Sequence, residues 1–302
     1  FFLRIQFSTL ALVLTCRTCA AHCACCNWSK ALTMPGKQEN LNPAEKPPRE
    51  ATAEADDSRT SRLANHFTEN IRSSVFAELQ LVILTICTGM QDATTFPDYH
   101  CFASNQTGNT VFLCLALILP SLNGDSFITS NIGMALGLFL GAGWLTGQLS
   151  HIIGPRKRWW LILCNLVQTC LVLGAAAVQY RHGVEVQGPA ALAVVGLLAF
   201  AAGSQVVQSR SLCMTEISTA MATAAWVDLM IDQRLFALKN RPRTRRVAFL
   251  SALVVGSLMG ALIYRNVGSP TAIAVSGGGK LLVTVLYLFS PSEKKQRDQS
   301  PA

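Results

Sequence analysis

Four long segments of this chain contain no charged residue, and they constrain its fold more than any other feature. They comprise residues 126–150, 159–180, 186–209 and 247–264, and none of them contains Asp, Glu, Lys or Arg. A helix needs roughly 17–25 mostly apolar residues to cross a bilayer core about 30 Å thick. A water-soluble domain would instead place charges at helical or strand intervals. The segments therefore predict an all-α, polytopic membrane protein built as a transmembrane helical bundle.

Two further segments meet the length requirement with one charge each. Residues 74–91 contain Glu78 and residues 270–289 contain Lys280, and we place both charges near an end of their segment. The composition agrees, because half of the residues are hydrophobic and only 14% are charged. We therefore expect six full spans in a transmembrane domain at 73–290.

Two shorter apolar stretches leave the number of spans open. Residues 107–120 and 217–231 are each about fifteen residues long or less, which is closer to re-entrant than to spanning length. If both cross, there are eight spans and the first basic cluster faces outward. If neither crosses, six spans remain, and every basic cluster faces the cytoplasm, as the positive-inside rule requires. We prefer six spans with both termini cytoplasmic. The clusters are Arg156–Arg158, Arg234–Arg246 and Lys294–Arg297.

We expect a disordered N-terminal tail at 1–72, Cys-rich at first and then polar, and a polar tail after the domain. Within an N-terminal tail at 1–72, the stretch 35–72 is rich in Pro, Ser and charged residues. Such a composition buries too little apolar surface to offset chain entropy, so we expect disorder there. Residues 5–15 resemble the hydrophobic region of a secretory signal, and both a cleaved signal and a spurious N-terminus stay open. Residues 291–302 form a short polar C-terminal tail.

Cysteines near the N-terminus offer only a weak metal signal. Cys16, Cys19 and His22 have ligand-like spacing, but no second pair of ligands follows. Structural zinc sites use two matched pairs, so we expect no metal and no cofactor. Unstructured or reversibly palmitoylated cysteines are the favoured interpretation.

A weak internal repeat relates the two halves of the domain. Gly89–Gln91 is echoed by Gly203–Gln205, each at the end of an apolar segment and each followed by a polar stretch rich in Ser and Thr. The repeat halves are about 74–150 and 189–265. In the six-span arrangement the first half enters from inside and the second from outside. This inverted topology is the one that builds many transporters around a site in the middle of the membrane.

The polar segment 89–110 is the best candidate for a functional site. Polar groups at membrane depth are tolerated only where protein buries them or water reaches them. Asp92, which Val206 replaces in the second half, is either a protonatable coupling carboxylate or a helix-end acid bonded to Thr94 or Thr95. The neighbouring amides and hydroxyls either bind a solute or ion or cap the next helix. The candidate binding residues are Gln91, Asp92, Asn105, Gln106, Thr107, Gly108, Asn109 and Gln205.

Glycines four residues apart predict close helix packing in both halves. Gly133, Gly137 and Gly141 form such a ladder in the first half, and Gly256 and Gly260 form one in the second. Small residues at this spacing let helix backbones approach each other. We expect the contacts to be made within the chain, with a homodimer face as the alternative.

The motifs resemble those of a known family. Gly89–Ala93 (Gly-x-x-Asp-Ala) followed by Phe102–Asn109, which ends in Thr-Gly-Asn, is similar to the YoaK-type family of uncharacterised bacterial and fungal membrane proteins. The resemblance covers roughly 74–290, includes Gly203–Gln205, and in its long polar tail is closest to the fungal-type members. Ser218–Ala220 departs from it, standing where a second Thr-Gly pair is expected. The resemblance implies a class of membrane protein rather than an activity.

Several functions are disfavoured by what the sequence lacks. It contains no Gly-x-Ser-x-Gly, His-Glu-x-x-His or P-loop motif, so we do not expect an enzyme. The net charge of +8 comes from residues beside the spans, where anionic lipids of the bilayer are the available partner, and not nucleic acid. We expect a secondary transporter or permease for a small solute. A non-transporting membrane scaffold or assembly protein is the alternative.

Overall fold

The computed structural model of the protein describes residues 66–293, apart from 125 and 238. The N-terminal cysteines, the signal-like run and the basic cluster Lys294–Arg297 lie outside the described residues. The elements, in chain order, are α3 (Val75–Tyr99), α4 (Gln106–Ile118), the short 3-10 helix η2 (Pro120–Leu122), α5 (Thr129–Ile153), α6 (Arg158–His182), α7 (Pro189–Ser211), α8 (Ala222–Met230), α9 (Arg241–Asn266) and α10 (Ser269–Leu288).

Within the described residues, six helices are long and apolar enough to cross a membrane, which confirms the expected number of spans. These are α3, α5, α6, α7, α9 and α10. The two shorter apolar stretches form α4 and α8, of 13 and 9 residues. At 1.5 Å per residue even α4 is only about 20 Å long, too short for a bilayer core of about 30 Å.

Helix α3 is longer than the apolar segment that predicts it. It continues through the polar residues after Gly89 and ends where His100 adopts a left-handed conformation (φ 52°). The helix can continue through this polar stretch because the threonine hydroxyls donate hydrogen bonds to carbonyl oxygens of the same helix. Thr88 donates to the Leu84 carbonyl at 3.0 Å and Thr94 to the Met90 carbonyl at 3.1 Å. The polar motif is therefore part of a continuous helix, and the irregular backbone begins only after it.

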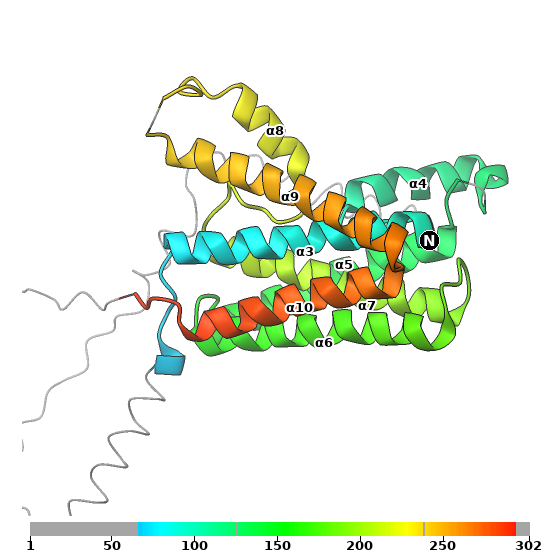
Figure 1. Cartoon of the computed structure of the whole chain (residues 1–302), viewed down its shortest axis with the longest axis horizontal. Helices are drawn as coiled ribbons and strands as arrows, with labels where there is room; N and C mark the ends of the chain where they lie inside the picture. The colour runs from blue at the N-terminus through cyan, green and yellow to red at the C-terminus, as the bar shows by residue number, and fades with distance from the viewer. Residues whose placement is uncertain (1–65, 125, 238, 294–302) are drawn as a thin grey trace, which may run out of the picture. The chain divides into compact units, whose positions relative to one another are not determined.

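The helices pack in pairs that cross between the two halves of the chain. Helix α3 packs along α9, and α5 packs along α7. Helices α6 and α10, which follow the first and the second repeat half in the chain, pack against each other, and α6 also contacts α7 while α10 contacts α3 (Figure 1). The short helices occupy corresponding places, since α4 lies against α5 and α8 against α9.

Glycines allow the closest of these contacts, but only part of the predicted ladder does so. A Cβ on Gly89 would lie 2.7 Å from the Leu253 carbonyl oxygen on α9, and one on Gly260 would lie 2.7 Å from Met90 Cα on α3. Gly256 likewise meets the backbone of Ile86, and Gly203 on α7 meets the Phe139 carbonyl on α5. The glycines at the α3–α9 and α5–α7 crossings thus bring backbones together.

The prediction for the other ladder is wrong. A Cβ at Gly133, Gly137 or Gly141 would meet no atom of the described residues within 4 Å, because the three glycines lie on a face of α5 that points away from its partner α7. On α5 it is instead Ala135 and Ala142 that are buried against the rest of the chain.

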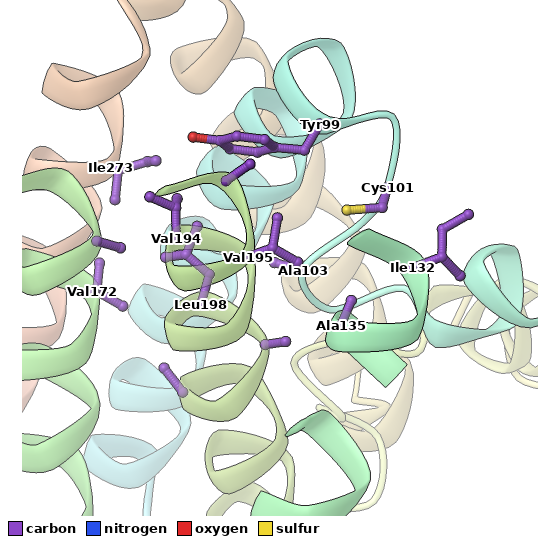
Figure 2. Packing of buried hydrophobic residues seen from close by; sticks show 14 of the residues in the cluster. Tyr99, Cys101, Ala103, Ile132, Ala135, Val172, Val194, Val195, Leu198 and Ile273 are labelled. Carbon is purple, nitrogen blue, oxygen red and sulfur yellow. The ribbon is translucent and has the colours of Figure 1, made fainter. Parts of the chain in front are cut away.

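The apolar core consists of two separate clusters. The first, here called the Tyr99 cluster, joins Tyr99 to residues of α5, α6, α7 and α10, including Val194, Leu198 and Ile273 (Figure 2). The second, the Tyr287 cluster, joins the starts of α3 and α6 to the ends of α7 and α10. Along each of the inner helices α3, α6, α7 and α10, buried polar residues separate the two clusters. Along its length, the interior of the bundle is therefore apolar at both ends and polar in the middle.

The two described basic clusters, Arg156–Arg158 and Arg234–Arg246, lie at the end of the bundle nearest the Tyr287 cluster. Asn70 pairs with Lys157 and Ile71 with Ser292 through isolated bridges, and Ile71 is fully buried. Arg158 is also buried and donates to the carbonyl oxygens of Leu288 and Ser290, at 2.7 Å each. These contacts place the chain before α3, the α5–α6 turn and the chain after α10 side by side, as an even number of spans requires.

Candidate functional site

The buried polar residues between the two apolar clusters form one layer contributed by four helices. We call it the central polar layer. All of its members are at least nine-tenths buried. They are Thr88 and Gln91 on α3, Asn165 and Gln168 on α6, Ser204, Gln205 and Gln208 on α7, and Ser276, Lys280 and Thr284 on α10.

Lys280 lies at the centre of this layer and is fully buried. It occupies the middle of α10 rather than an end of the segment, which corrects the position expected from the sequence. Its ammonium group donates to Gln205 Oε1 on α7 and, at 3.4 Å, to Gln168 Oε1 on α6. Within the described residues no carboxylate oxygen lies within 4.0 Å of Lys280 Nζ. The charge is held by neutral amide oxygens alone.

Both glutamine partners are themselves fixed by neighbours. Gln205 Nε2 donates to Thr88 Oγ1 on α3 at 2.9 Å. Gln168 Nε2 donates to Gln208 Oε1 at 3.0 Å and to Ser204 Oγ at 3.2 Å on α7. In a low-dielectric interior such linked hydrogen bonds reinforce each other. The ammonium group is thus connected to all four inner helices.

Further amides complete the layer on either side of Lys280. Asn165 Nδ2 donates to the Lys280 carbonyl oxygen at 2.7 Å and to Thr284 Oγ1 at 2.8 Å, which joins α6 to α10. Gln91 Nε2 donates to Ser276 Oγ at 3.1 Å and joins α3 to α10. Asn165 Oδ1 is buried without a hydrogen-bond donor, so the layer retains an unused acceptor.

Asp92, the acid singled out in the sequence, lies outside this layer. It is partly exposed and faces the loop between α3 and α4. Its carboxylate accepts hydrogen bonds from the Ser104 backbone N–H at 2.9 Å and from the Ser104 hydroxyl. In this geometry Asp92 clamps the loop to the side of α3.

The Thr-Gly-Asn element holds the same loop from α4. Asn109 is fully buried; its Oδ1 accepts from the Phe102 N–H at 3.0 Å and its Nδ2 donates to the Phe102 carbonyl at 2.8 Å. Gln106 Nε2 donates to the Ala103 carbonyl at 3.0 Å. A Cβ on Gly108 would lie 3.2 Å from the Phe102 ring, which in turn stacks on Phe96. The side chains of Asn109 and Gln106 thus make their hydrogen bonds to the α3–α4 loop.

The predicted site therefore divides into two groups. Asn105 and Thr107 are exposed, and Asn105 makes no side-chain capping bond to α4 although it occupies the N-cap position. Gln91 and Gln205 alone among the candidates belong to the central polar layer. The sequence did contain a signal for the missed residue, because Lys280 is the one charge in an apolar segment.

A buried carboxylate, Asp98, was also missed by the sequence analysis. It lies on α3 beside the Tyr99 cluster, where Gln179 Nε2 on α6 donates to Asp98 Oδ2 at 3.4 Å and to the Tyr99 hydroxyl at 2.7 Å. Ser269 at the start of α10 joins the same group. This polar group connects α3, α6 and α10 on the side of the layer opposite the basic end.

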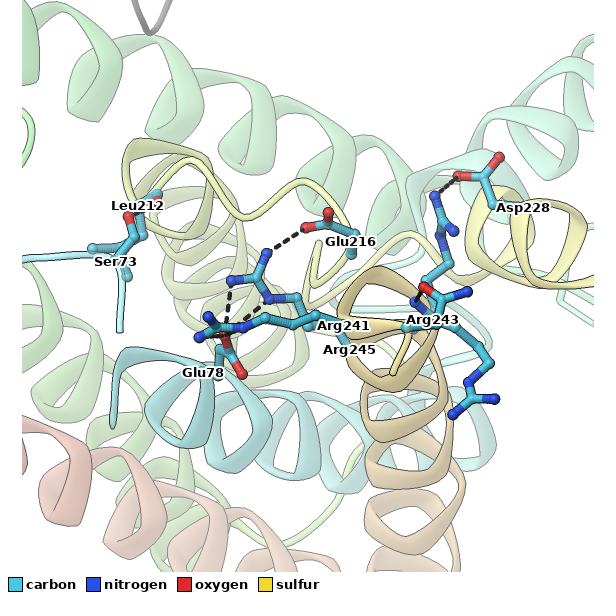
Figure 3. Close-up of polar contacts among 10 residues, drawn as sticks. Ser73, Glu78, Leu212, Glu216, Asp228, Arg241, Arg243 and Arg245 are labelled. Atoms are coloured by element: carbon cyan, nitrogen blue, oxygen red, sulfur yellow. Dashed lines mark hydrogen bonds and ion pairs between the residues drawn. The ribbon is translucent and has the colours of Figure 1, made fainter. Parts of the chain in front are cut away.

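At the basic end, ion pairs connect the starts of α3 and α9 (Figure 3). Glu78 Oε1 accepts from Arg241 Nη2 at 2.8 Å and from Arg245 Nη2 at 2.7 Å. Arg245 also pairs with Glu216, in the segment after α7, at 3.3 Å. Ser73 Oγ donates to the Leu212 carbonyl at 2.7 Å in the same region. These contacts join three segments across this end of the bundle.

The chain was also compared with known proteins. The family model described as "Protein of unknown function (DUF1275)" matches residues 80–286. The chain belongs to this family. No curated protein and no solved structure matches it.

The DUF1275 match begins within the second turn of α3 and ends near the end of α10, so it covers the central polar layer and the Asp92 loop alike. It confirms the expected assignment to a family without known activity. The finer assignment to YoaK-type, fungal-type members stays a prediction.

Proposed function

We propose that this DUF1275 protein is a secondary transporter or permease for a small solute, and that the central polar layer is its solute site. The observation that carries the proposal is Lys280, a fully buried ammonium group at mid-bundle whose hydrogen-bond acceptors among the described residues are amide oxygens. Charged residues in the interior of membrane bundles are costly, and they commonly mark substrate or ion pathways.

The pairing of helices supports an inverted repeat around this layer. Each half supplies three spans, namely α3, α5 and α6, then α7, α9 and α10. An odd number of spans per half gives the halves opposite orientations. Exchanging each helix for its counterpart converts the α3–α9 pair into α7–α5 and the α6–α7 pair into α10–α3, and all four pairs pack. Transporters with inverted repeats bind their solutes where the halves meet.

The closed ends of the bundle agree with alternating access. The Tyr287 cluster and the Glu78 ion pairs cover the layer toward the basic end, and the Tyr99 cluster covers it toward the other. A solute can reach the layer only if one end opens at a time. The proposed arrangement is thus an occluded form of a transporter.

Solute access to the layer is testable with cysteine chemistry. Ser204→Cys and Ser276→Cys change one atom each in the layer, and they are placed in a background without native cysteines. Both thiols should react with a small polar thiol reagent applied to membranes, and a transported solute should slow the reaction. Ala199→Cys, in the Tyr99 cluster, is the matched control and should stay unreactive because apolar packing surrounds it.

The native cysteines have to be removed for this experiment, although some of their thiols are poor nucleophiles. Burial, together with the charge of Asp92, raises the pKa of the Cys101 thiol in the α3–α4 loop to about 12. That thiol stays protonated at neutral pH and reacts slowly. If Ser204→Cys and Ser276→Cys are as unreactive as Ala199→Cys, water does not enter the layer and the transport proposal fails.

The unpartnered face of α5 favours a second function, that of a scaffold. Gly133, Gly137 and Gly141 offer a surface on which the backbone of another helix can lie closely. Trp144, on the same helix, is largely exposed. A scaffold role predicts self-association through α5, which cross-linking of a Gly137→Cys variant in membranes would detect, together with an unreactive central layer.

A further inference from the structure

The charges and polar groups around Lys280 indicate which solutes the layer favours. Lys280 is the only charged residue in the central polar layer as the described residues define it. The other members offer amide and hydroxyl groups. A cationic solute would meet an ammonium group and no carboxylate, so the layer disfavours metal ions and organic cations.

The acids of the neighbouring helix α3 have other partners. Glu78 pairs with two arginines at the basic end, Asp92 accepts from Ser104, and Asp98 bonds to Gln179. None of them therefore serves as a counter-charge for Lys280. In the described part of the chain, the one other titratable group that acts on the ammonium is the thiol of Cys87, also on α3.

An uncompensated ammonium at this depth is expensive. The effective penalty for burying one ion in a protein is several kcal/mol, and neutral amide oxygens recover only part of it. An anion beside Lys280 would supply the missing counter-charge. The layer also contains donors for its oxygens, since Gln168 and Gln205 contact the ammonium, Ser204 bonds to Gln168, and Ser276 lies one turn from Lys280 on α10.

We propose that the central polar layer binds a small anion whose charge is matched by Lys280. The inference rests on the proposed transport function and specifies its substrate class. A small carboxylate and an inorganic anion share this chemistry, namely a compact negative charge that accepts hydrogen bonds. Gln168 and Gln205 hold the ammonium in place until the anion arrives and then turn their amide groups toward it.

Binding is tested first on the full-length protein in detergent, without any substitution. Thermal unfolding is followed with formate, acetate, chloride or phosphate, and with acetamide as the uncharged counterpart of acetate at equal ionic strength. A ligand that binds only the folded state raises the unfolding temperature. At least one anion should do so, and acetamide should not. Equal effects of acetate and acetamide, or no effect of any anion, would overturn the proposal.

Variants then locate the site. Lys280→Gln should abolish the stabilisation by the anion and lower its uptake into proteoliposomes by about tenfold or more, as expected for the loss of one charge-assisted hydrogen bond. Arg265→Gln removes an equal charge from the exposed end of α9 and should change neither. Cys87→Ser should also retain the stabilisation by the anion and its uptake. If Cys87→Ser loses them, a thiolate already pairs with Lys280 and the proposal is overturned.

The same vesicles separate this inference from the transport proposal. Glycerol and ethanolamine serve as uncharged and cationic probes beside the anions. If one of them crosses faster than in protein-free vesicles, and equally fast with wild type and Lys280→Gln, while no anion does, the substrate class is wrong and the transporter proposal stands. If no solute of any class crosses or stabilises the protein, both proposals fail.

Discussion

Asp92 and Asn109 hold the loop between α3 and α4 from two sides. Asp92 receives the backbone and hydroxyl hydrogens of Ser104, and Asn109 pairs with both backbone groups of Phe102. The described hydrogen bonds of both side chains go to the α3–α4 loop and to α4, and not to the central polar layer. The motif that drew attention in the sequence thus acts, in this geometry, on local structure.

This geometry makes a prediction about Asp92→Asn. An amide can accept from only one of the two Ser104 donors, because its NH₂ group then faces the other. We expect the free energy of unfolding to fall by about 1.5–3 kcal/mol, the range for hydrogen bonds to charged groups. Chemical or thermal unfolding in detergent measures it, and Ser104→Ala, which removes one donor, should lose less.

The contrary outcome for Asp92 has a clear meaning. If Asp92→Asn unfolds like wild type but its solute uptake no longer depends on pH, then the carboxylate carries a proton or ion. In that case the coupling role considered from the sequence would be restored.

The sequence could not separate Asp92 from its neighbour Gln91. Consecutive residues of a helix point about 100° apart, so Gln91 faces α10 while Asp92 faces the loop. A linear motif merges them into one site. Lys280 was visible as an isolated charge, but its partners come from α6 and α7, and nothing in local spacing identifies them.

At the scale of helices, the glycines indicate which helix pairs have their backbones in close contact. A Cβ added to Gly203 on α7 would meet the Phe139 backbone on α5, whereas one added to Gly137 on α5 would meet nothing within 4 Å in the described part of the chain. Both sit in apolar helices, so substitution by alanine has the same effect on helix propensity at the two positions.

The two glycines therefore form a matched test. Gly203→Ala should destabilise the protein by about 1–3 kcal/mol, because its Cβ overlaps a carbonyl oxygen that can move only with its helix. Gly137→Ala should change stability by less than about 0.5 kcal/mol. The yield of monodisperse protein and its unfolding temperature measure both, and equal losses would contradict the described packing.

The spans themselves were largely predictable, but their partners were not. Stretches free of charge, such as 247–264, give the positions of the helices because a bilayer excludes charges. A helix that is apolar on every side does not reveal which side meets protein and which meets lipid. For that reason the glycine ladders of α5 and α9 looked equivalent in sequence and differ in structure.

For the whole molecule, the described basic segments share one end, and this makes the topology testable. A reporter inserted after Gly154 should lie on the same side of the membrane as one inserted after Glu293. A reporter after Gly183, in the α6–α7 turn, should lie on the other side. If the Gly154 and Gly183 reporters lie on the same side, the six-span arrangement is wrong.

The ion pairs at the basic end lead to a prediction about opening. Glu78→Gln weakens the contacts with Arg241 and Arg245 that join α3 to α9. If this end opens during transport, a thiol at Ser204→Cys should react several times faster in the Glu78→Gln background. Asp228→Asn is the control, since its pair with Arg246 is half exposed and should leave the rate unchanged. An unchanged rate with Glu78→Gln would show that these pairs do not restrain the opening.

The two kinds of helix contact differ in stiffness, and this bears on how the bundle can move. Because Gly256 and Gly203 let the backbones come close together, we expect α3 with α9 and α5 with α7 to move as two stiff helix pairs. Between the two pairs lie hydrogen bonds of rotatable side chains such as Gln168 and Gln205, which can exchange partners without large clashes. We therefore expect Lys280 to lie near the axis about which the two helix pairs tilt. The chain moves least there, so a bound ion would be exposed to the other side of the membrane with little displacement.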